Sequence, residues 1–219
     1  MPHKLSAQSA QSAKSAQSIQ VMAMPASPKQ SPSEAYSREA FLALMWALSY
    51  PGSGFALPTV SNNNDSDGLQ SIGHALLDLE TSYYTADAEL ERALRKTGAI
   101  SWPLAAADYV FFPRLTAQDI PALEQLKVGD YTYPDNSATL IVGCAFDNNA
   151  THLSAQYTAL CLNGPGIQEV QTIHVAELPD SFWALRAGLI RYPLGIDIML
   201  VSRGWVIGLP RTTQVSLCM

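Results

Sequence analysis

The chain has 219 residues, a mass of 23.7 kDa and a formal charge of −6, which suits one domain of ordinary size or two small ones. Its longest unbroken apolar run, at 40–48, is far shorter than the roughly 20 residues that cross a bilayer, so we expect a soluble protein with no membrane partner. The charged residues of the first 33 are all lysines, and the remaining acidic body would repel a phosphate backbone, which argues against nucleic acid as a partner.

A low-complexity segment opens the chain. Residues 6–20 read SAQSAQSAKSAQSIQ, and several prolines follow. This composition offers too little apolar surface to offset the entropy of ordering the backbone. We therefore expect a disordered Ser/Ala/Gln/Pro-rich tail over 1–33 and a single α/β domain over 34–219. The apolar stretch VMAM is too short for a signal peptide, and the lack of arginine argues against an organelle transit peptide.

Helical periodicity begins at Ser33 and is expected to end before Pro51-Gly52. The spacing predicts that one face of this first helix packs on the core, with Phe41, Leu44, Met45 and Leu48. Further helices are predicted over 67–80 (with Leu69, Ile72, Leu76 and Leu79 aligned), 87–99 (from an Asp87 cap to a Gly98 stop), 117–129 (ending at Gly129) and 178–190 (capped by Asp180 or Ser181).

Strands are predicted over 82–86, 106–113, 138–146 and 152–162, the last two paired across Asp147-Asn148-Asn149. The C-terminal apolar runs 196–201 and 205–209 are expected to form a hairpin around Ser202-Arg203-Gly204. Because both runs are almost continuously apolar, we expect helices to cover them on both faces. Interleaved helices and strands predict an α/β fold with a mixed β-sheet flanked by helices in three layers.

The familiar catalytic motifs are absent: the sequence contains no P-loop, no H-E-x-x-H and no G-x-S-x-G. His74, His152 and His174 lack a second ligand at metal spacing, so we expect no metal. The acidic pairs Asp65/Asp67 and Glu89/Glu91 fit a solvated surface. The GPG of LNGPGIQEV, with Gly164 and Gly166, is either a simple turn or a backbone loop that faces a ligand.

Three cysteines, Cys144, Cys161 and Cys218, are odd in number and form no C-x-x-C pair. This pattern argues against a disulfide framework and against a structural zinc site. A reducing, cytoplasmic setting fits it best.

Asp197 is conspicuous in so apolar a strand, because an unpaired buried charge costs several kcal/mol. A three-residue hairpin loop would place it opposite Leu209 and diagonal to Arg211. We predict an ion pair between Asp197 and Arg211, with the hydroxyls of Thr212 and Thr213 beside it. The pair is either a structural tie at the hairpin end or a site where Arg211 and the threonines donate to a phosphate or to another subunit.

The same segment, PLGIDIMLVSRGWVIGLPRTT, is similar to the C-terminal signature of the H subunit family of the bacterial carbon-phosphorus lyase system. The resemblance extends to LNGPGI (162–167), KVGDYTYPDNSATLIV (127–142) and ALSYPG (47–52). It covers about 34–219. One departure is that Leu42 follows Phe41, where the family commonly has a basic residue.

The resemblance implies a reduced pyridoxal-phosphate-dependent transferase fold without the cofactor, a homodimer, and assembly with the G, I and J subunits in a core complex. It also implies a part in making α-D-ribose 1-methylphosphonate 5-triphosphate from ATP and methylphosphonate. A stand-alone transferase and a purely structural assembly subunit remain as alternatives.

The lysines give a separate argument about the cofactor. Beyond the tail there are only Lys96 and Lys127, each just before a glycine that marks a predicted helix end, where a cation complements the helix dipole. Neither is placed to form the Schiff base that a pyridoxal enzyme needs, so we expect no cofactor.

Overall fold

The computed structural model describes residues 31–58, 65–147 and 156–218. Several expectations concern positions outside these ranges, namely most of the predicted tail, the Asn148-Asn149 part of the predicted turn, and His152. The end of the predicted tail belongs to the first helix, because that helix begins at Pro32 and Ser31 caps it.

The helices of the described ranges are α1 (Pro32–Ser49), α2 (Asp65–Leu76), α3 (Ala88–Leu94), α4 (Ile120–Leu123), α5 (Phe182–Leu189) and the 3-10 helix η1 (Arg95–Thr97). None of them is long and apolar enough to cross a bilayer. The large sheet consists, in spatial order, of β1 (Gly54–Ala56), β10 (Trp205–Leu209), β9 (Asp197–Ser202), β5 (Thr139–Gly143), β4 (Tyr109–Phe112), β2 (Ser82–Thr85) and β3 (Ile100–Ser101). The small sheet consists of β11 (Gln214–Leu217), β7 (Thr158–Asn163), β8 (Gln171–Ala176) and β6 (Ala145–Asp147).

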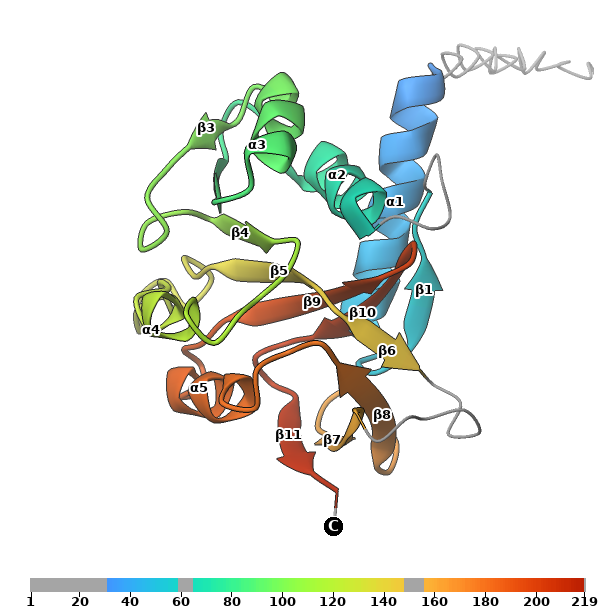
Figure 1. Cartoon of the computed structure of the whole chain (residues 1–219), viewed down its shortest axis with the longest axis vertical. Helices are drawn as coiled ribbons and strands as arrows, with labels where there is room; N and C mark the ends of the chain where they lie inside the picture. The colour runs from blue at the N-terminus through green and yellow to red at the C-terminus, as the bar shows by residue number, and fades with distance from the viewer. Residues whose placement is uncertain (1–30, 59–64, 148–155, 219) are drawn as a thin grey trace, which may run out of the picture.

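The large sheet is mixed, as the sequence predicts. Strands β9, β5, β4, β2 and β3 are parallel to one another, whereas β10 is antiparallel to β9 and β1 is antiparallel to β10. The small sheet is antiparallel throughout. It lies beside the C-terminus in Figure 1.

The two faces of the large sheet are covered differently (Figure 1). On one face, Ile141 and Met199 point into a core shared with Leu44 of α1 and Ile72 of α2. On the other face, residues such as Leu140 pack against the small sheet and α5. The predicted mixed sheet with helices is therefore present, but the cover on this second face consists partly of another sheet rather than of helices alone.

The core face predicted for helix α1 is confirmed at Leu44, which is buried, and at Leu48, which packs against the core, but not at Phe41 and Met45. Its N-terminus has a capping box in which Ser31 and Glu34 exchange hydrogen bonds. The buried residues are Ala40, Ala43, Leu44 and Ala47, whereas Phe41 and Met45 are 50% and 40% exposed. The helix approaches the sheet closely near its end: a Cβ on Gly208 of β10 would lie 2.6 Å from the carbonyl of Ala47, so the small residue Ala47 lies against the strand at this point.

Two predicted helices end early. Helix α2 stops at Leu76, and Leu79 is 78% exposed, because the side chains of Asp78 and Thr81 accept hydrogen bonds from backbone N–H groups and form a turn instead. Only Ile120–Leu123 of the predicted helix 117–129 is α-helical. Val128 pairs with Ser137 in an antiparallel bridge, which draws the chain into an extended conformation.

The predicted strand 138–146 is divided between the two sheets. β5 ends at Gly143, where a Cβ would lie 2.2 Å from the carbonyl oxygen of Pro113, and β6 then pairs with β8. The predicted pairing of 152–162 with this strand is wrong, because β7 pairs with β8 and β11. Strand β8 was not predicted from the sequence.

The C-terminal hairpin is present, with a shorter loop than predicted. Ser202 pairs with Trp205, so only Arg203 and Gly204 form the turn. Both have positive φ, 47° and 79°, as a type I′ turn requires. The shorter loop shifts the register by one residue, and Leu209 therefore faces Ile198 rather than Asp197.

The expectation that the cysteines form no disulfide is wrong. Cys161 of β7 is bonded to Cys218, with their Cα atoms 5.2 Å apart, while Cys144 is buried. The pairing of β11 with β7 brings the two together, and the spacing along the chain gave no sign of it. The argument from cysteines for a reducing compartment therefore loses its basis.

Candidate functional site

Asp197 and Arg211 form the predicted ion pair. Asp197 begins β9 and Arg211 follows the end of β10, so the hairpin brings both residues to the same end of the sheet. Oδ1 accepts hydrogen bonds from the backbone N–H of Arg211 at 2.7 Å and from its Nε at 3.3 Å, and Oδ2 accepts one from Nη2 at 2.7 Å. Paired contacts of this kind fix the orientation of a guanidinium as well as its position.

The remaining Arg211 contacts are also within the protein. Nη1 donates to the carbonyl oxygen of Pro134, and Nη2 donates to the hydroxyl of Ser137 at 2.6 Å. The ion pair is largely enclosed, with side-chain exposures of 15% for Arg211 and 23% for Asp197. These contacts occupy all three nitrogens of the guanidinium and favour the structural tie over the ligand-donating alternative.

The threonines after Arg211 differ from each other. Thr213 is only 1% exposed, and its backbone N–H donates to the carbonyl of Pro210 at 2.9 Å, closing a turn. Its buried hydroxyl has no hydrogen-bond partner among the described residues. Thr212 is partly exposed and lines a cavity.

Arg186 is a residue of this site that the sequence reasoning missed. It lies on α5, is 4% exposed, and its Nη2 donates to the carbonyl oxygens of Pro210 and Thr213 at 3.0 and 2.9 Å. Burial lowers the pKa of Arg186 to about 10, an effect that the negative charge of Asp197 partly opposes. The sequence did carry a signal for the burial of Arg186. It lies one helical turn after Phe182, on the buried side of a short apolar helix.

A cavity of about 460 Å³ lies between α5 and residues 211–215. Arg186, Arg211, Thr212 and Thr213 contribute polar groups to its lining, and Ile190 and Val215 contribute apolar surface. A concave, partly apolar site with a few convergent polar groups is the usual form of a small-molecule site.

The lysines are placed differently from each other. Lys96 is exposed in η1 and is followed by Gly98 in the left-handed conformation, which agrees with the predicted helix end. Lys127 does not lie at a helix end. It donates to Asp108, which begins the β4 region, and to Asn136 at 3.2 Å, so this ammonium group is already engaged in a salt bridge.

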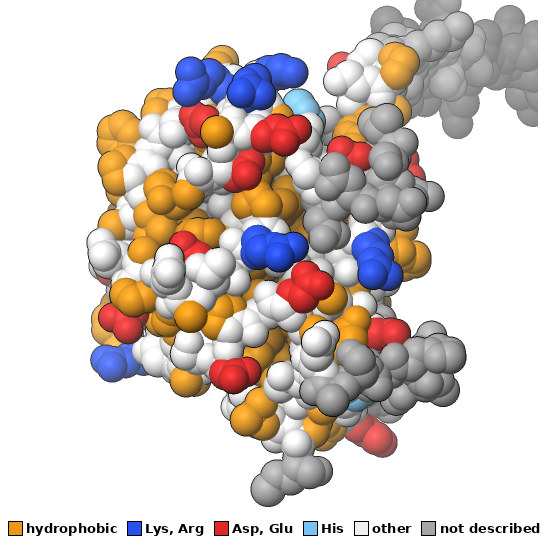
Figure 2. Space-filling model, viewed as in Figure 1, with side chains coloured by type: hydrophobic (Ala, Val, Ile, Leu, Met, Phe, Trp, Pro, Cys, Tyr) orange, Lys and Arg blue, Asp and Glu red, His pale blue; other side chains and the backbone are white. Residues whose placement is uncertain are grey.

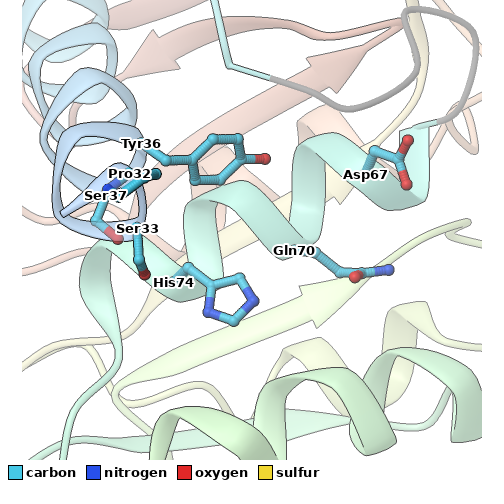
Figure 3. Close-up of a pocket in the computed structure, with 7 residues that line it drawn as sticks. All are labelled: Pro32, Ser33, Tyr36, Ser37, Asp67, Gln70 and His74. Carbon is cyan, nitrogen blue, oxygen red and sulfur yellow. The ribbon is translucent and has the colours of Figure 1, made fainter.

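A second cavity, of about 390 Å³, lies between the start of α1 and α2 (Figure 3). His74 and Asp67 both line it, but Figure 3 places them at opposite ends, with Gln70 between them. They therefore form no acid-base pair. In the described ranges, no group of three or more His, Cys, Asp or Glu side chains could hold a metal ion.

The family model for "Bacterial phosphonate metabolism protein (PhnH)" matches residues 28–216. The chain belongs to the PhnH family. Among curated relatives, it is 32% identical over 187 residues to the "Putative C-P lyase subunit protein HtxG" of Stutzerimonas stutzeri, covering 81% of this chain and 85% of that protein. It is 34% identical over 110 residues to the "Alpha-D-ribose 1-methylphosphonate 5-triphosphate synthase subunit PhnH" of Rhizobium meliloti (strain 1021), covering 49% of this chain and 50% of that one.

The four segments that carried the PhnH resemblance lie in contact with one another in the structure. The 127–142 segment supplies the acceptors Pro134 and Ser137. The GPG loop packs on the PRTT segment at Gly164, where a Cβ would lie 2.8 Å from the carbonyl oxygen of Thr212. The loop also packs on the end of α1 at Gly166, where a Cβ would lie 2.5 Å from a backbone oxygen.

The GPG loop has the geometry of a tight turn. Gly166 has φ 83°, and the N–H of Ile167 donates to the carbonyl of Gly164 at 3.1 Å, with Pro165 at the second position. The close backbone contacts explain both glycines without a ligand. This geometry favours the turn interpretation of the loop.

Proposed function

We propose that the chain is a subunit of the carbon-phosphorus lyase core complex and takes part in forming α-D-ribose 1-methylphosphonate 5-triphosphate from ATP and methylphosphonate. The observation that carries this proposal is the family match over 28–216. The relative from Rhizobium meliloti, whose name states the synthase, supports it over about half of the chain.

A role within an assembly, with the chain on its own not catalytic, is supported by the outer face of α1. Here the aromatic and aliphatic residues Phe41, Leu42, Met45, Trp46 and Tyr50 are between 38% and 50% exposed, and the rings of Trp46 and Tyr50 stack at 5.7 Å. Grouped apolar side chains on one face of a helix are typical of a surface that another chain covers. We name these five residues the α1 outer face.

The proposed partners are the G, I and J subunits and a second copy of the chain, in the cytoplasm. Charge supports protein partners over nucleic acid: on the face shown in Figure 2, basic side chains lie beside acidic ones rather than in a continuous strip. The chain also carries a net charge of −6.

Under this proposal the fold is a reduced pyridoxal-phosphate-dependent transferase fold that works without the cofactor. The engagement of Lys127 by Asp108 and the exposed position of Lys96 on η1 support this, because a Schiff-base lysine needs an enclosed pocket.

For the site, we propose that Asp197 orients Arg211 and that the pair holds Thr212 and Thr213 in place. Arg211 acts as a positioning residue, because its guanidinium contacts Asp197, Pro134 and Ser137. Gly164 supports the same segment through its contact with the backbone of Thr212.

The direct test is to purify the chain with its presumed partners and to measure adenine release from ATP plus methylphosphonate with and without it. The proposal expects release only when this chain is present. Release by the chain alone would favour a stand-alone transferase. Release that is unchanged when the chain is omitted would overturn the proposal.

A second test concerns assembly. Trp46→Glu, on the α1 outer face, should weaken association of the chain with itself or with its partners in size-exclusion chromatography with light scattering. Leu79→Glu is the matched control, because Leu79 is an exposed apolar residue away from that face. If both variants assemble like the parent chain, the α1 outer face is not an interface.

A further inference from the structure

The cluster around Asp197 has more positive than negative charge. Asp197 is the carboxylate that contacts Arg211, and it is also the charge that acts on Arg186. The charge of one carboxylate is therefore shared by two enclosed guanidiniums, and Arg211 makes all the direct contacts with it. A buried cation without a partner is strongly disfavoured, and the pKa of Arg186, even lowered to about 10 by burial, leaves it charged at neutral pH.

Two buried donors of the same cluster also lack partners in the described part of the chain. These are Nε of Arg186 and the hydroxyl of Thr213. Both hydrogen bonds that hold the Arg186 guanidinium are made by Nη2. Most buried polar groups in proteins are hydrogen-bonded, and exceptions call for an explanation.

The cavity beside Arg186 and Thr213 explains why these two donors lack partners within the protein. Arg186 and Thr213 both line the space of about 460 Å³ between α5 and residues 211–215. The negative charge that would balance Arg186 is absent from the lining, which contains no acidic residue. Its apolar part, with Ile190 and Val215, could accommodate an organic substituent.

We propose that this cavity binds a phosphate-class oxyanion, with the Arg186 guanidinium as its counter-charge and the Thr213 hydroxyl as a donor. Phosphate, phosphate esters and organic phosphonates share this tetrahedral, anionic chemistry. Arg211 does not bind the anion. Arg211 also lines the cavity, but all three of its guanidinium nitrogens already donate to Asp197, Pro134 and Ser137. Its part is to hold the Pro210–Thr213 turn in position. This inference rests on the proposed function only for the choice of probes.

A structural interpretation of Arg186 makes a different prediction. If Arg186 served only to tie α5 to the Pro210–Thr213 turn through the two carbonyl oxygens, the Thr213 hydroxyl would have no role. Thr213→Val would then leave anion binding unchanged and would leave the free energy of unfolding unchanged or raise it slightly. The reason is that the variant replaces an unpaired buried hydroxyl with a methyl group of similar shape.

The experiment measures the thermal unfolding midpoint and isothermal titration of the full chain without partners. The probes are methylphosphonate and inorganic phosphate, with sodium chloride at matched ionic strength. The proposal expects a midpoint that rises with the concentration of at least one probe and not with chloride. Tighter binding of methylphosphonate would identify an organic phosphonate as the ligand, and tighter binding of phosphate would identify a phosphate.

The variants are Thr213→Val and Arg186→Lys, each compared with Thr172→Val at an exposed position of β8. Thr213→Val should weaken binding about tenfold, the usual effect of losing a hydrogen bond to a charged group. Arg186→Lys should also weaken it, because an ammonium cannot reproduce the planar fork. Urea unfolding without anion establishes whether each variant folds. If Thr213→Val does not fold, Arg186→Lys provides the test.

The inference is overturned if neither probe raises the midpoint beyond chloride, or if Thr213→Val and Arg186→Lys both bind as tightly as Thr172→Val. Because binding is measured on the chain alone, this result is independent of adenine release by the complex. The site can therefore fail while the subunit role stands, or the reverse.

Discussion

Arg211 and Arg186 both line the cavity beside the Pro210–Thr213 turn, but they differ in their partners. Arg211 makes hydrogen bonds to Asp197, Pro134 and Ser137, whereas among the described residues Arg186 donates only to backbone carbonyls and its Nε has no partner. Arg186 is nevertheless the more deeply buried, at 4% exposure. Burial therefore does not distinguish the structural arginine from the proposed binding one. The distinction comes from whether a carboxylate already compensates the charge.

The largest effect is expected from Asp197→Asn, which removes the carboxylate that both guanidiniums share. We expect a loss of about 3 kcal/mol in the free energy of unfolding, because two enclosed cations remain without compensation. Urea unfolding measures this. The double variant Asp197→Asn/Arg211→Met should be more stable than Asp197→Asn alone, and a double variant that is worse would contradict the shared-charge description.

Removing the disulfide with Cys161→Ser/Cys218→Ser should have the next largest effect, a loss of about 2 kcal/mol. The disulfide joins the end of β11 to β7. The two arginines hold the other end of the same segment, at the Pro210–Thr213 turn. Phosphate binding should survive, because the Pro210–Thr213 turn keeps its own contacts. Alkylation of thiols in freshly lysed cells would report whether the bond forms in the cell: free thiols would agree with the proposed cytoplasmic location, and a bonded pair would contradict it.

Arg186→Met should lower the free energy of unfolding in urea by only about 1 kcal/mol, less than Asp197→Asn does. The variant loses two hydrogen bonds to carbonyl oxygens, but it also removes a charge whose burial is unfavourable. A loss as large as that of Asp197→Asn would show that Arg186 is a structural residue like Arg211 and would remove the contrast between them.

The smallest effect is expected at Asp108, where the pair with Lys127 is partly exposed, at 39% and 20% respectively. Burial alone would raise the pKa of Asp108, but hydrogen bonds from Lys127 and Ser82 outweigh it and hold the pKa below its usual value. The ionised carboxylate therefore stabilises the fold above pH of about 4, and this contribution is lost as the pH falls through the folded-state pKa.

Asp108→Asn should accordingly lower the free energy of unfolding by less than about 1 kcal/mol at pH 7, because solvent screens such a pair. The difference from the parent chain should shrink as unfolding is measured at successively lower pH toward 3. Lys127→Met is the companion variant and should show the same trend. A difference that grows on acidification would mean that the carboxyl group is more stable in its neutral form.

Local sequence patterns predicted several elements correctly. The Asp87 cap and the Gly98 stop are where the spacing placed them, β2 lies within 82–86, and the terminal hairpin pairs Asp197 with Arg211. These features depend on neighbours close in the chain, or on a strong rule such as the cost of an unpaired charge. The core face of α1 was predicted only in part, right at Leu44 and wrong at Phe41 and Met45, because the close approach of Gly208 to Ala47 is a contact between distant residues.

The sequence by itself determined the α/β class, the mixed sheet and membership of the PhnH family, because periodicity and motif spacing are properties of the order of residues. Only the tertiary structure joined Cys161 to Cys218 and placed Arg186 beside Thr213. Each of these pairs is separated by many residues along the chain. Whether such residues meet is decided by how the two sheets and α5 pack together, which no local pattern encodes.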